Sequence, residues 1–267
     1  MGSRAVALLA GAWVAAVCGC RSIGSVRAGS DEAQPVSVAE AQSMRQEAEL
    51  LYNQQPRSLA TVTRAAGLFE QAADALQDDY VAQWEAAEAQ EFLAANETRA
   101  DLRRQSAQRG IAFARRAREL KPDGVEACYW YALNVGWLAD VDRAYGLDAV
   151  TEMQSALKRA IELDERYDYA GPLRLMGILH LRTPQPPASI GSPRTGLRLL
   201  ERAVSLFPDY PENYLYLAEA LRDNKRVEEA KEALRKVVEA KPWPDEQFES
   251  EQWKADAVKL RAQMEKR

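Results

Sequence analysis

Apolar residues recur along the chain at helical spacing, with a small residue beside a large one. Near the C-terminus two such sets follow each other, and the second ends at Pro242, which cannot continue a helix. The first set is Tyr214, Leu217, Ala218 and Leu221, and the second is Ala230, Leu234 and Val237. This pattern predicts two consecutive amphipathic helices.

The second half of this pattern recurs four more times upstream. The sets are Ala65, Phe69 and Ala72; Gly110, Ala114 and Ala117; Met153, Leu157 and Ala160; and Gly196, Leu200 and Ala203. Pro208 and Pro242 lie 34 residues apart, which is one tetratricopeptide period. Residues 40–242 therefore resemble the tetratricopeptide repeat, in which small residues let two antiparallel helices approach and large ones fill the neighbouring pair. This resemblance implies an all-α solenoid of helical hairpins.

The middle units are longer than the period. Pro122 to Glu165 and Glu165 to Pro208 each span 43 residues, so each unit carries an insertion. The first insertion lies around residues 139–146. The second lies at 183–194, where four prolines and a glycine exclude a helix.

These spacings predict five helix pairs and a final helix. The pairs are 38–54 with 57–76, 80–96 with 98–120, 124–140 with 145–164, 168–182 with 193–207, and 211–223 with 226–240. Helix 245–266 would turn Trp253, Ala257 and Leu260 inward and cap the open end of the array. The repeat domain is expected to span residues 38–267.

The N-terminus has the pattern of a secretory leader. One basic residue, Arg4, precedes thirteen apolar or small residues, which is too short a run to span a membrane. The run ends Val17-Cys18-Gly19-Cys20, which resembles a bacterial lipobox. The resemblance implies cleavage after residue 19 and lipidation of Cys20. The alternative is an ordinary secretory signal cut near Gly19.

Residues 20–37 then form a polar stretch rich in Gly and Ser, typical of a flexible tether. The residue after Cys20 is Arg21 rather than Asp, which resembles the default signal for the outer membrane. We therefore expect a periplasm-facing protein of the cell envelope, held by lipid at the outer membrane.

Composition narrows the chemistry further. The chain has 40 acidic and 35 basic residues, and this balance gives no bulk attraction to nucleic acid. The sequence contains no phosphate-binding glycine loop, nucleophile elbow or zinc-protease motif. His180 is the only histidine. It occupies a position of the repeat that a large side chain usually fills, so we expect a packed, hydrogen-bonded residue rather than a ligand or base. Cys128 stands among apolar residues and is best explained as a small buried hydrophobe. We expect no enzyme, no metal site and no cofactor.

The inner faces of the first helices are the candidate binding surface. Residues spaced by four stack on one face of a helix. Helix 124–140 presents Tyr129, Leu133 and Trp137, and helix 168–182 presents Arg174, Ile178 and Arg182. Arg194 follows the Pro-rich segment and is expected to reach the same region. An aromatic wall facing guanidinium groups suits a small organic anion or an acidic peptide end. The alternative is that these side chains only pack between repeats and pair with local carboxylates.

Three longer segments resemble a narrower group, the T-component lipoproteins associated with tripartite ATP-independent periplasmic (TRAP) transporters. The features that carry the resemblance are Gly171-Pro172, the face Leu175-Met176-Gly177 followed by His180, and the Pro-rich segment 183–194. The resemblance implies an accessory protein that partners a periplasmic solute-binding protein.

Two functions from different classes therefore stand at this point, and an enzyme is the least favoured third. One is the solute-handling accessory lipoprotein, and the other is a protein–protein scaffold for outer-membrane or envelope assembly. The Pro-rich segment is compatible with a lid over helix 168–182 or with a contact between copies of the chain, so homo-oligomerisation stays open.

Overall fold

The computed structural model describes residues 36–265. The predicted leader 1–19, Cys20 and nearly all of the predicted tether lie outside the described residues, so those assignments stay predictions. The described part contains eleven α-helices and one short 3-10 helix, η1 (Arg143–Tyr145). The α-helices are α1 (Val38–Tyr52), α2 (Leu59–Ala75), α3 (Tyr80–Asn96), α4 (Ala100–Leu120), α5 (Val125–Val141), α6 (Gly146–Asp164), α7 (Tyr167–Arg182), α8 (Pro193–Leu206), α9 (Pro211–Asp223), α10 (Val227–Glu239) and α11 (Gln247–Glu265).

These helices confirm the all-α solenoid of five hairpins and a final helix. The helix starts follow the capping chemistry of the sequence. Ser37 accepts a hydrogen bond from the backbone N–H of Glu40, whose carboxylate accepts one from the backbone N–H of Ser37. Asp79 and Ser192 cap α3 and α8 through their side-chain oxygens.

The small positions of the repeat bring paired helices into close contact. In the α7–α8 pair, a Cβ added at Gly196 would lie 2.9 Å from the carbonyl oxygen of Gly177. Ala203, on the same face of α8, is fully buried. Backbone-to-backbone approach of this kind leaves no room for larger side chains, which explains the recurring Gly and Ala.

The start of α7 departs from the prediction. Asp168, Tyr169 and Ala170 have φ values of 48°, 52° and 66°, so the predicted helix 168–182 opens with a left-handed turn. Pro172 has no N–H to donate and disfavours the helical conformation in the residue before it. The carbonyl oxygens of Asp168 and Tyr169 accept hydrogen bonds from the Arg174 side chain instead, at 3.4 and 3.3 Å.

The insertion at 183–192 forms a folded loop. His180 Nδ1 lies 2.8 Å from the carbonyl oxygen of Ile190, and the N–H of Ser192 donates to the carbonyl oxygen of His180. A Cβ at Gly191 would lie 2.0 Å from the carbonyl oxygen of Thr183, so this turn requires glycine. His180 is thus a packed, hydrogen-bonded residue that fastens the loop to α7.

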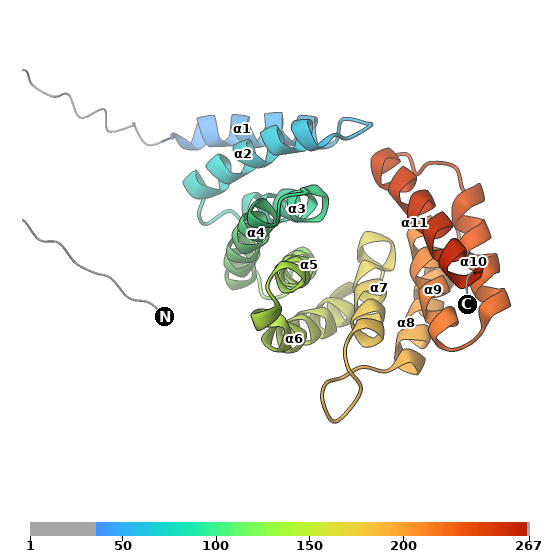
Figure 1. Cartoon of the computed structure of the whole chain (residues 1–267). Helices are drawn as coiled ribbons and strands as arrows, with labels where there is room; N and C mark the ends of the chain where they lie inside the picture. Colours follow the sequence, from blue (N-terminus) through green and yellow to red (C-terminus); the bar gives the residue numbers. More distant parts are fainter. Residues whose placement is uncertain (1–35, 266–267) are drawn as a thin grey trace, which may run out of the picture. The chain divides into compact units, whose positions relative to one another are not determined.

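The last helix joins the two ends of the repeat array. One face of α11 buries Trp253, Ala257 and Leu260, and these pack with residues of α9 and α10. The start of α11 lies beside the turn between α1 and α2, as Figure 1 shows. There the Arg57 side chain donates to the carbonyl oxygen of Asp245 at 2.8 Å and pairs with Glu249 at 3.4 Å. We call this the closing contact.

The closing contact turns the described helices into a closed arc around a central space. Phe92 of α3 packs against Phe248 of α11 with ring centroids 5.7 Å apart, which extends the contact to the second hairpin. None of the described helices is both long and apolar enough to cross a membrane.

Candidate functional site

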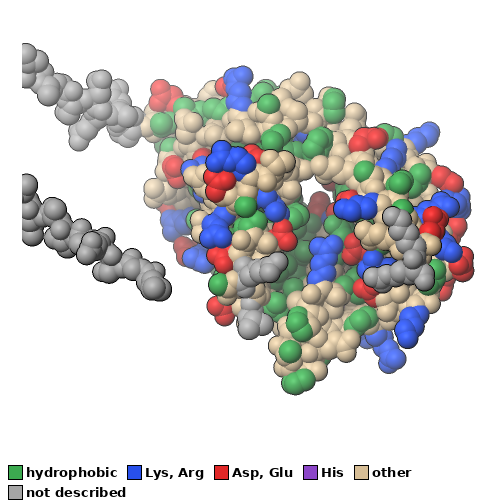
Figure 2. All heavy atoms as spheres, viewed as in Figure 1, with side chains coloured by type: hydrophobic (Ala, Val, Ile, Leu, Met, Phe, Trp, Pro, Cys, Tyr) green, Lys and Arg blue, Asp and Glu red, His purple; other side chains and the backbone are tan. Residues whose placement is uncertain are grey.

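Two adjoining compartments occupy the centre of the arc. The smaller has a volume of about 450 Å³ and the larger about 530 Å³. Tyr129, Leu133, Trp137 and Arg174 line both, so the compartments form one inner cavity. Figure 2 shows the surface hollowed there, with charged side chains around the opening. Volumes of this size are typical of small-molecule sites.

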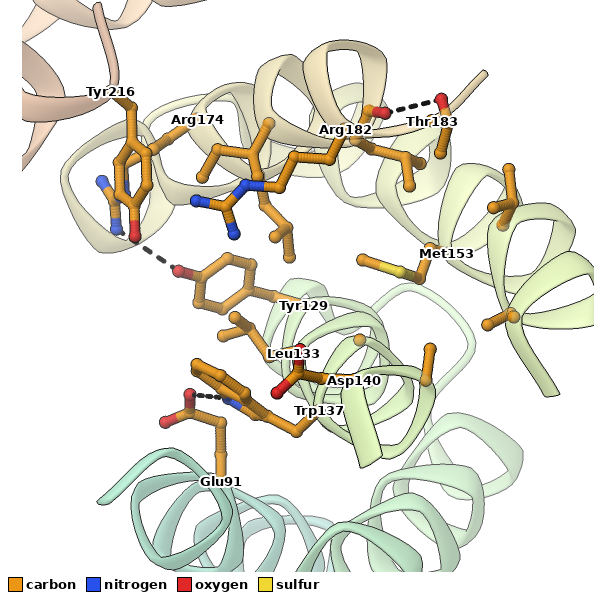
Figure 3. Close-up of a pocket in the computed structure, with 18 of the residues that line it drawn as sticks. Glu91, Tyr129, Leu133, Trp137, Asp140, Met153, Arg174, Arg182, Thr183 and Tyr216 are labelled. Atoms are coloured by element: carbon orange, nitrogen blue, oxygen red, sulfur yellow. Dashed lines mark hydrogen bonds between the residues drawn. The ribbon is translucent and has the colours of Figure 1, made fainter. Parts of the chain in front are cut away.

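Six of the seven predicted site residues line the smaller compartment (Figure 3). They are Tyr129, Leu133 and Trp137 of α5 and Arg174, Ile178 and Arg182 of α7. Their spacing by four on two neighbouring first helices places both rows on the same concave wall. That they bind a ligand stays a prediction.

Arg194 lies elsewhere. It is the second residue of α8, it is exposed, and it lines neither compartment. The loop before it folds back on His180 rather than over the cavity, and of the Pro-rich segment only Thr183 lines the smaller compartment. The expectation that Arg194 joins the other two arginines was therefore wrong.

Arg174 is a buried ion-pairing residue with 5% exposure. Its Nη2 lies 3.0 Å from Asp168 Oδ2 and its Nε lies 2.8 Å from Glu212 Oε2. Nη1 also donates to Asn213 Oδ1 at 3.1 Å, and the hydroxyl of Tyr129 donates to Asp168 Oδ2 at 2.5 Å. The left-handed turn makes this possible, because it aims Asp168 at Tyr129 and Arg174. We call these residues the paired wall: Tyr129, Asp168, Arg174, Glu212 and Asn213.

Gly171 is required beside this wall. A Cβ there would lie 2.5 Å from the Tyr129 hydroxyl oxygen and 2.7 Å from Asp168 Oδ2. No side chain fits between them without displacing the hydrogen bond.

On the facing side of the cavity, two carboxyl groups of α3 make no ion pair with a described residue. Glu91 accepts a hydrogen bond from Trp137 Nε1 at 2.7 Å. Glu88 takes part in no hydrogen bond or ion pair with any other described residue. Burial raises the pKa of Glu88 to about 8 and that of Glu91 to about 7, and neighbouring acidic groups add to both shifts. We call Glu88 and Glu91 the unpaired wall.

The C-terminal segment contributes further acidic groups. Glu246 accepts a hydrogen bond from the Tyr210 hydroxyl at 2.8 Å, and burial raises the pKa of Glu246 to about 8. Glu249 pairs with Arg57 through one oxygen, while its Oε2 is buried and has no hydrogen-bond partner in the described structure.

These acidic residues were not selected from the sequence. Extending the spacing by four from α5 to α3 would have found Glu88 together with its neighbour Phe92. Glu88 and Phe92 are four residues apart and occupy in α3 the positions that Leu133 and Trp137 occupy in α5. Asp168 and Glu246 had no such signal, because a broken helix and a tertiary contact place them.

Within residues 36–265, no three His, Cys, Asp or Glu side chains are grouped so that they could hold a metal ion. Cys128 is buried at 2% exposure, away from the cavity lining.

Comparison with known proteins gives the family. Residues 44–182 match the family model described as regulator of microtubule dynamics protein 1-3, which covers more than half of the chain. The chain belongs to this family. Residues 191–247 match a tetratricopeptide-repeat model, which covers α8, α9 and α10. No curated protein matches the chain.

Solved structures agree with the fold. The chain is similar to the thermophilic TPR protein TTC0263 of Thermus thermophilus, with 21% identity and a TM-score of 0.61 over 82% of this chain and 100% of that one. It is also similar to the pilF protein of Pseudomonas aeruginosa, with 15% identity and a TM-score of 0.53 over 84% of this chain and 92% of that one. At these identities the likeness concerns the fold alone. Repeat proteins of this fold generally act as non-catalytic binding scaffolds.

Proposed function

We propose that this chain is a non-catalytic envelope lipoprotein that receives a small organic solute in its inner cavity and passes it to or from a periplasmic solute-binding protein. The observation that carries the proposal is the cavity inside the closed arc of helices. An open tetratricopeptide groove suits an extended peptide, whereas the closing contact bounds this groove at both ends of the array. The aromatic residues of the lining give an apolar solute a surface to pack against.

The envelope location and the partner class rest on sequence resemblance. The lipobox-like segment supports lipidation at Cys20, and the resemblance to T-component lipoproteins supports a partner from a TRAP-type transporter. A protein anchored in a bacterial envelope would not meet microtubules. The proposal therefore does not include the role named in the family description.

The anchor is tested by labelling cells with radioactive palmitate and fractionating them. We expect label on the wild-type chain, and we expect the Cys20→Ser variant to lose the label and leave the membrane fraction. Cys18→Ser is the matched control and should change neither result. An unlabelled wild type, or a Cys20→Ser chain that stays in the membrane fraction, would refute the lipoprotein proposal.

The partner is tested by capture from solubilised envelopes followed by mass spectrometry. We expect enrichment of a solute-binding protein of the TRAP class over an unrelated lipoprotein used as bait. Enrichment of outer-membrane or pilus assembly proteins instead would favour the scaffold function.

A further inference from the structure

The larger compartment is strongly acidic. Seven carboxylates and only two guanidinium groups, Arg57 and Arg174, are among its lining residues. Asp256 is exposed at the rim. The other six carboxylates are Glu88, Glu91, Asp168, Glu212, Glu246 and Glu249. Like charges gathered in a partly buried space repel one another unless protons or a cation neutralise them.

Both guanidinium groups are already engaged. Arg174 is held between Asp168 and Glu212, and Arg57 pairs with Glu249 and donates to the carbonyl oxygen of Asp245. Arg182, at the smaller compartment, lies 3.5 Å from Glu219 and is largely exposed. Arg57 and Arg174, the two cations of the larger compartment, are therefore already paired with carboxylates, so this compartment does not suit the anion that the arginines alone suggested.

Three carboxylates keep unused accepting capacity. Glu88 has no polar partner in the described structure, Glu91 accepts only from the Trp137 indole, and Glu246 accepts only from the Tyr210 hydroxyl. They come from two elements on different sides of the compartment, α3 and the segment that leads into α11. Oxygens from two sides are the arrangement that a multi-donor ammonium or guanidinium group requires.

Aromatic rings complete the environment. Tyr52, Phe92, Trp130, Trp137, Tyr216 and Trp253 line the larger compartment together with the carboxylates. Aromatic faces attract organic cations and cover their hydrocarbon stems, but they do not replace the water shell of a metal ion. This combination distinguishes an organic cation from an inorganic one.

We propose that the inner cavity binds an organic cation, an ammonium or guanidinium group on an apolar stem, held by the carboxylates of Glu88, Glu91 and Glu246. The inference rests on the proposed function, because it names the class of solute that the cavity receives. The same chemistry is available in a free amine and in a basic side chain of a partner protein.

The test is calorimetric titration at about pH 9, above the raised pKa values of these three carboxyl groups, with two probes of similar size and opposite charge, 2-phenylethylammonium and 3-phenylpropionate. We expect the ammonium to bind and the carboxylate not to bind. The double variant Glu88→Gln with Glu91→Gln should weaken ammonium binding at least about tenfold. Glu246→Gln should weaken it independently, from the other side of the compartment. The matched control is Glu228→Gln with Glu232→Gln, two exposed positions on the outer helix α10, which should bind as the wild type does.

A third probe separates the two sources of the cation. This probe is a short peptide of alternating Lys and Leu with blocked ends. Binding of the free amine at least as tightly as the peptide assigns a free solute, and binding of the peptide alone assigns a partner's side chain. Both results support the inference when the Glu88 and Glu91 substitutions weaken them.

The inference is overturned if neither cation binds, or if the carboxamide variants bind the ammonium as well as the wild type does. Binding of 3-phenylpropionate that is lost in the cavity-filling variant Leu133→Trp would overturn the cation but leave the proposed solute site standing. Failure to enrich a solute-binding protein in the capture experiment would count against the proposed function and leave the cation result unchanged. Far-ultraviolet circular dichroism of each variant establishes that it is folded.

Discussion

The paired wall and the unpaired wall both present carboxyl groups to the same cavity. They differ in whether those carboxyl groups have a cation as a partner. On the paired wall, Arg174 satisfies Asp168 and Glu212 at distances of 3.0 and 2.8 Å, and Asn213 and Tyr129 join the same network. On the unpaired wall, Glu88 makes no hydrogen bond or ion pair with a described residue, although Arg57 lies near enough to oppose the rise of its pKa, and Glu91 has only an indole donor. A buried carboxylate with its own cation belongs to the fold, whereas one without a cation is available to a ligand.

The largest effect should come from breaking the paired wall. Arg174 is itself buried, and Arg174→Met leaves two largely buried carboxylates without their cation, so we expect the free energy of unfolding to fall by about 3–5 kcal/mol. Chemical denaturation followed by circular dichroism measures it. Arg182→Met is the control, because this exposed arginine pairs only with Glu219, and the expected loss is about 0–1 kcal/mol. Equal losses in the two variants would mean that Arg174 has no special structural role.

A smaller loss should follow from crowding the same wall. Gly171→Ala places a methyl group 2.5 Å from the Tyr129 hydroxyl oxygen, so we expect destabilisation of about 1–3 kcal/mol. Gly67→Ala in α2 is the matched control, since a Cβ there meets no other atom within 4 Å. That change should stabilise the chain by about 0.5–1 kcal/mol. If both variants move the melting temperature in the same direction, the close packing of α5 against the start of α7 is not as described.

Glu88 of the unpaired wall and Glu246 of the C-terminal segment should make stability depend on pH. The ordinary carboxyl pKa is 4.5, whereas Glu88 and Glu246 have pKa values raised to about 8, so between these values the folded chain binds protons that the unfolded chain releases. Stability must therefore fall as the pH rises from about 5 to about 8. Arg57 opposes the shift of Glu88, while Asp168, Glu85 and Glu91 increase it. Around Glu246, Arg174 and the Tyr210 hydroxyl oppose the shift, while Asp168 and Glu212 increase it.

Melting temperatures across this pH range measure the slope. Glu88→Gln with Glu246→Gln should flatten it and raise the melting temperature at pH 8, because the amides carry no charge to desolvate. Glu228→Gln should leave the slope unchanged, since that residue is exposed on α10. A wild-type chain whose stability rises through this range would contradict the unpaired state of these carboxylates.

The smallest expected effect is that of a substitution on the outer face. Glu229→Leu on the exposed face of α10 should change the free energy of unfolding by less than about 0.5 kcal/mol. Ala203 on α8 is fully buried, so the comparison variant Ala203→Leu should lower it by about 1–3 kcal/mol. Comparing their melting temperatures tests whether the repeat positions are correctly assigned. Equal effects would mean that the register is shifted.

Most of the fold could be predicted from the sequence because the repeated small residues and prolines mark where each helix begins and ends. Once the small residues and Pro208 and Pro242 were aligned, each helix of a pair had little freedom in where it began and ended. The left-handed turn at Asp168 escaped prediction because three consecutive non-glycine residues rarely adopt that conformation without tertiary support. Here Arg174 and Asn213 supply that support by hydrogen bonding to carbonyl oxygens of the turn.

The sequence predicted the aromatic and arginine residues of the candidate site but not its acidic residues. The rows on α5 and α7 follow from helical spacing, and they do line one cavity. Helical spacing says nothing about charge partners, so it cannot show that Arg174 pairs with Glu212, 38 residues later. The acidic groups Glu246 and Glu249, at the start of α11, reach the cavity through the closing contact. No local sequence pattern predicts a contact between the two ends of a chain.

The closing contact also sets how the chain must fold. In an open array each hairpin contacts only its neighbours, so folding spreads locally and the terminal repeats fray first. Here Gln55 donates to the carbonyl oxygen of Asp245, a contact across 190 residues. Forming such a contact costs a large loop-closure entropy. It therefore forms only after the intervening hairpins have brought the two segments close together. Joining the ends should therefore be a late step, and once made it couples the first and last hairpins into one cooperative unit that no longer frays from either end.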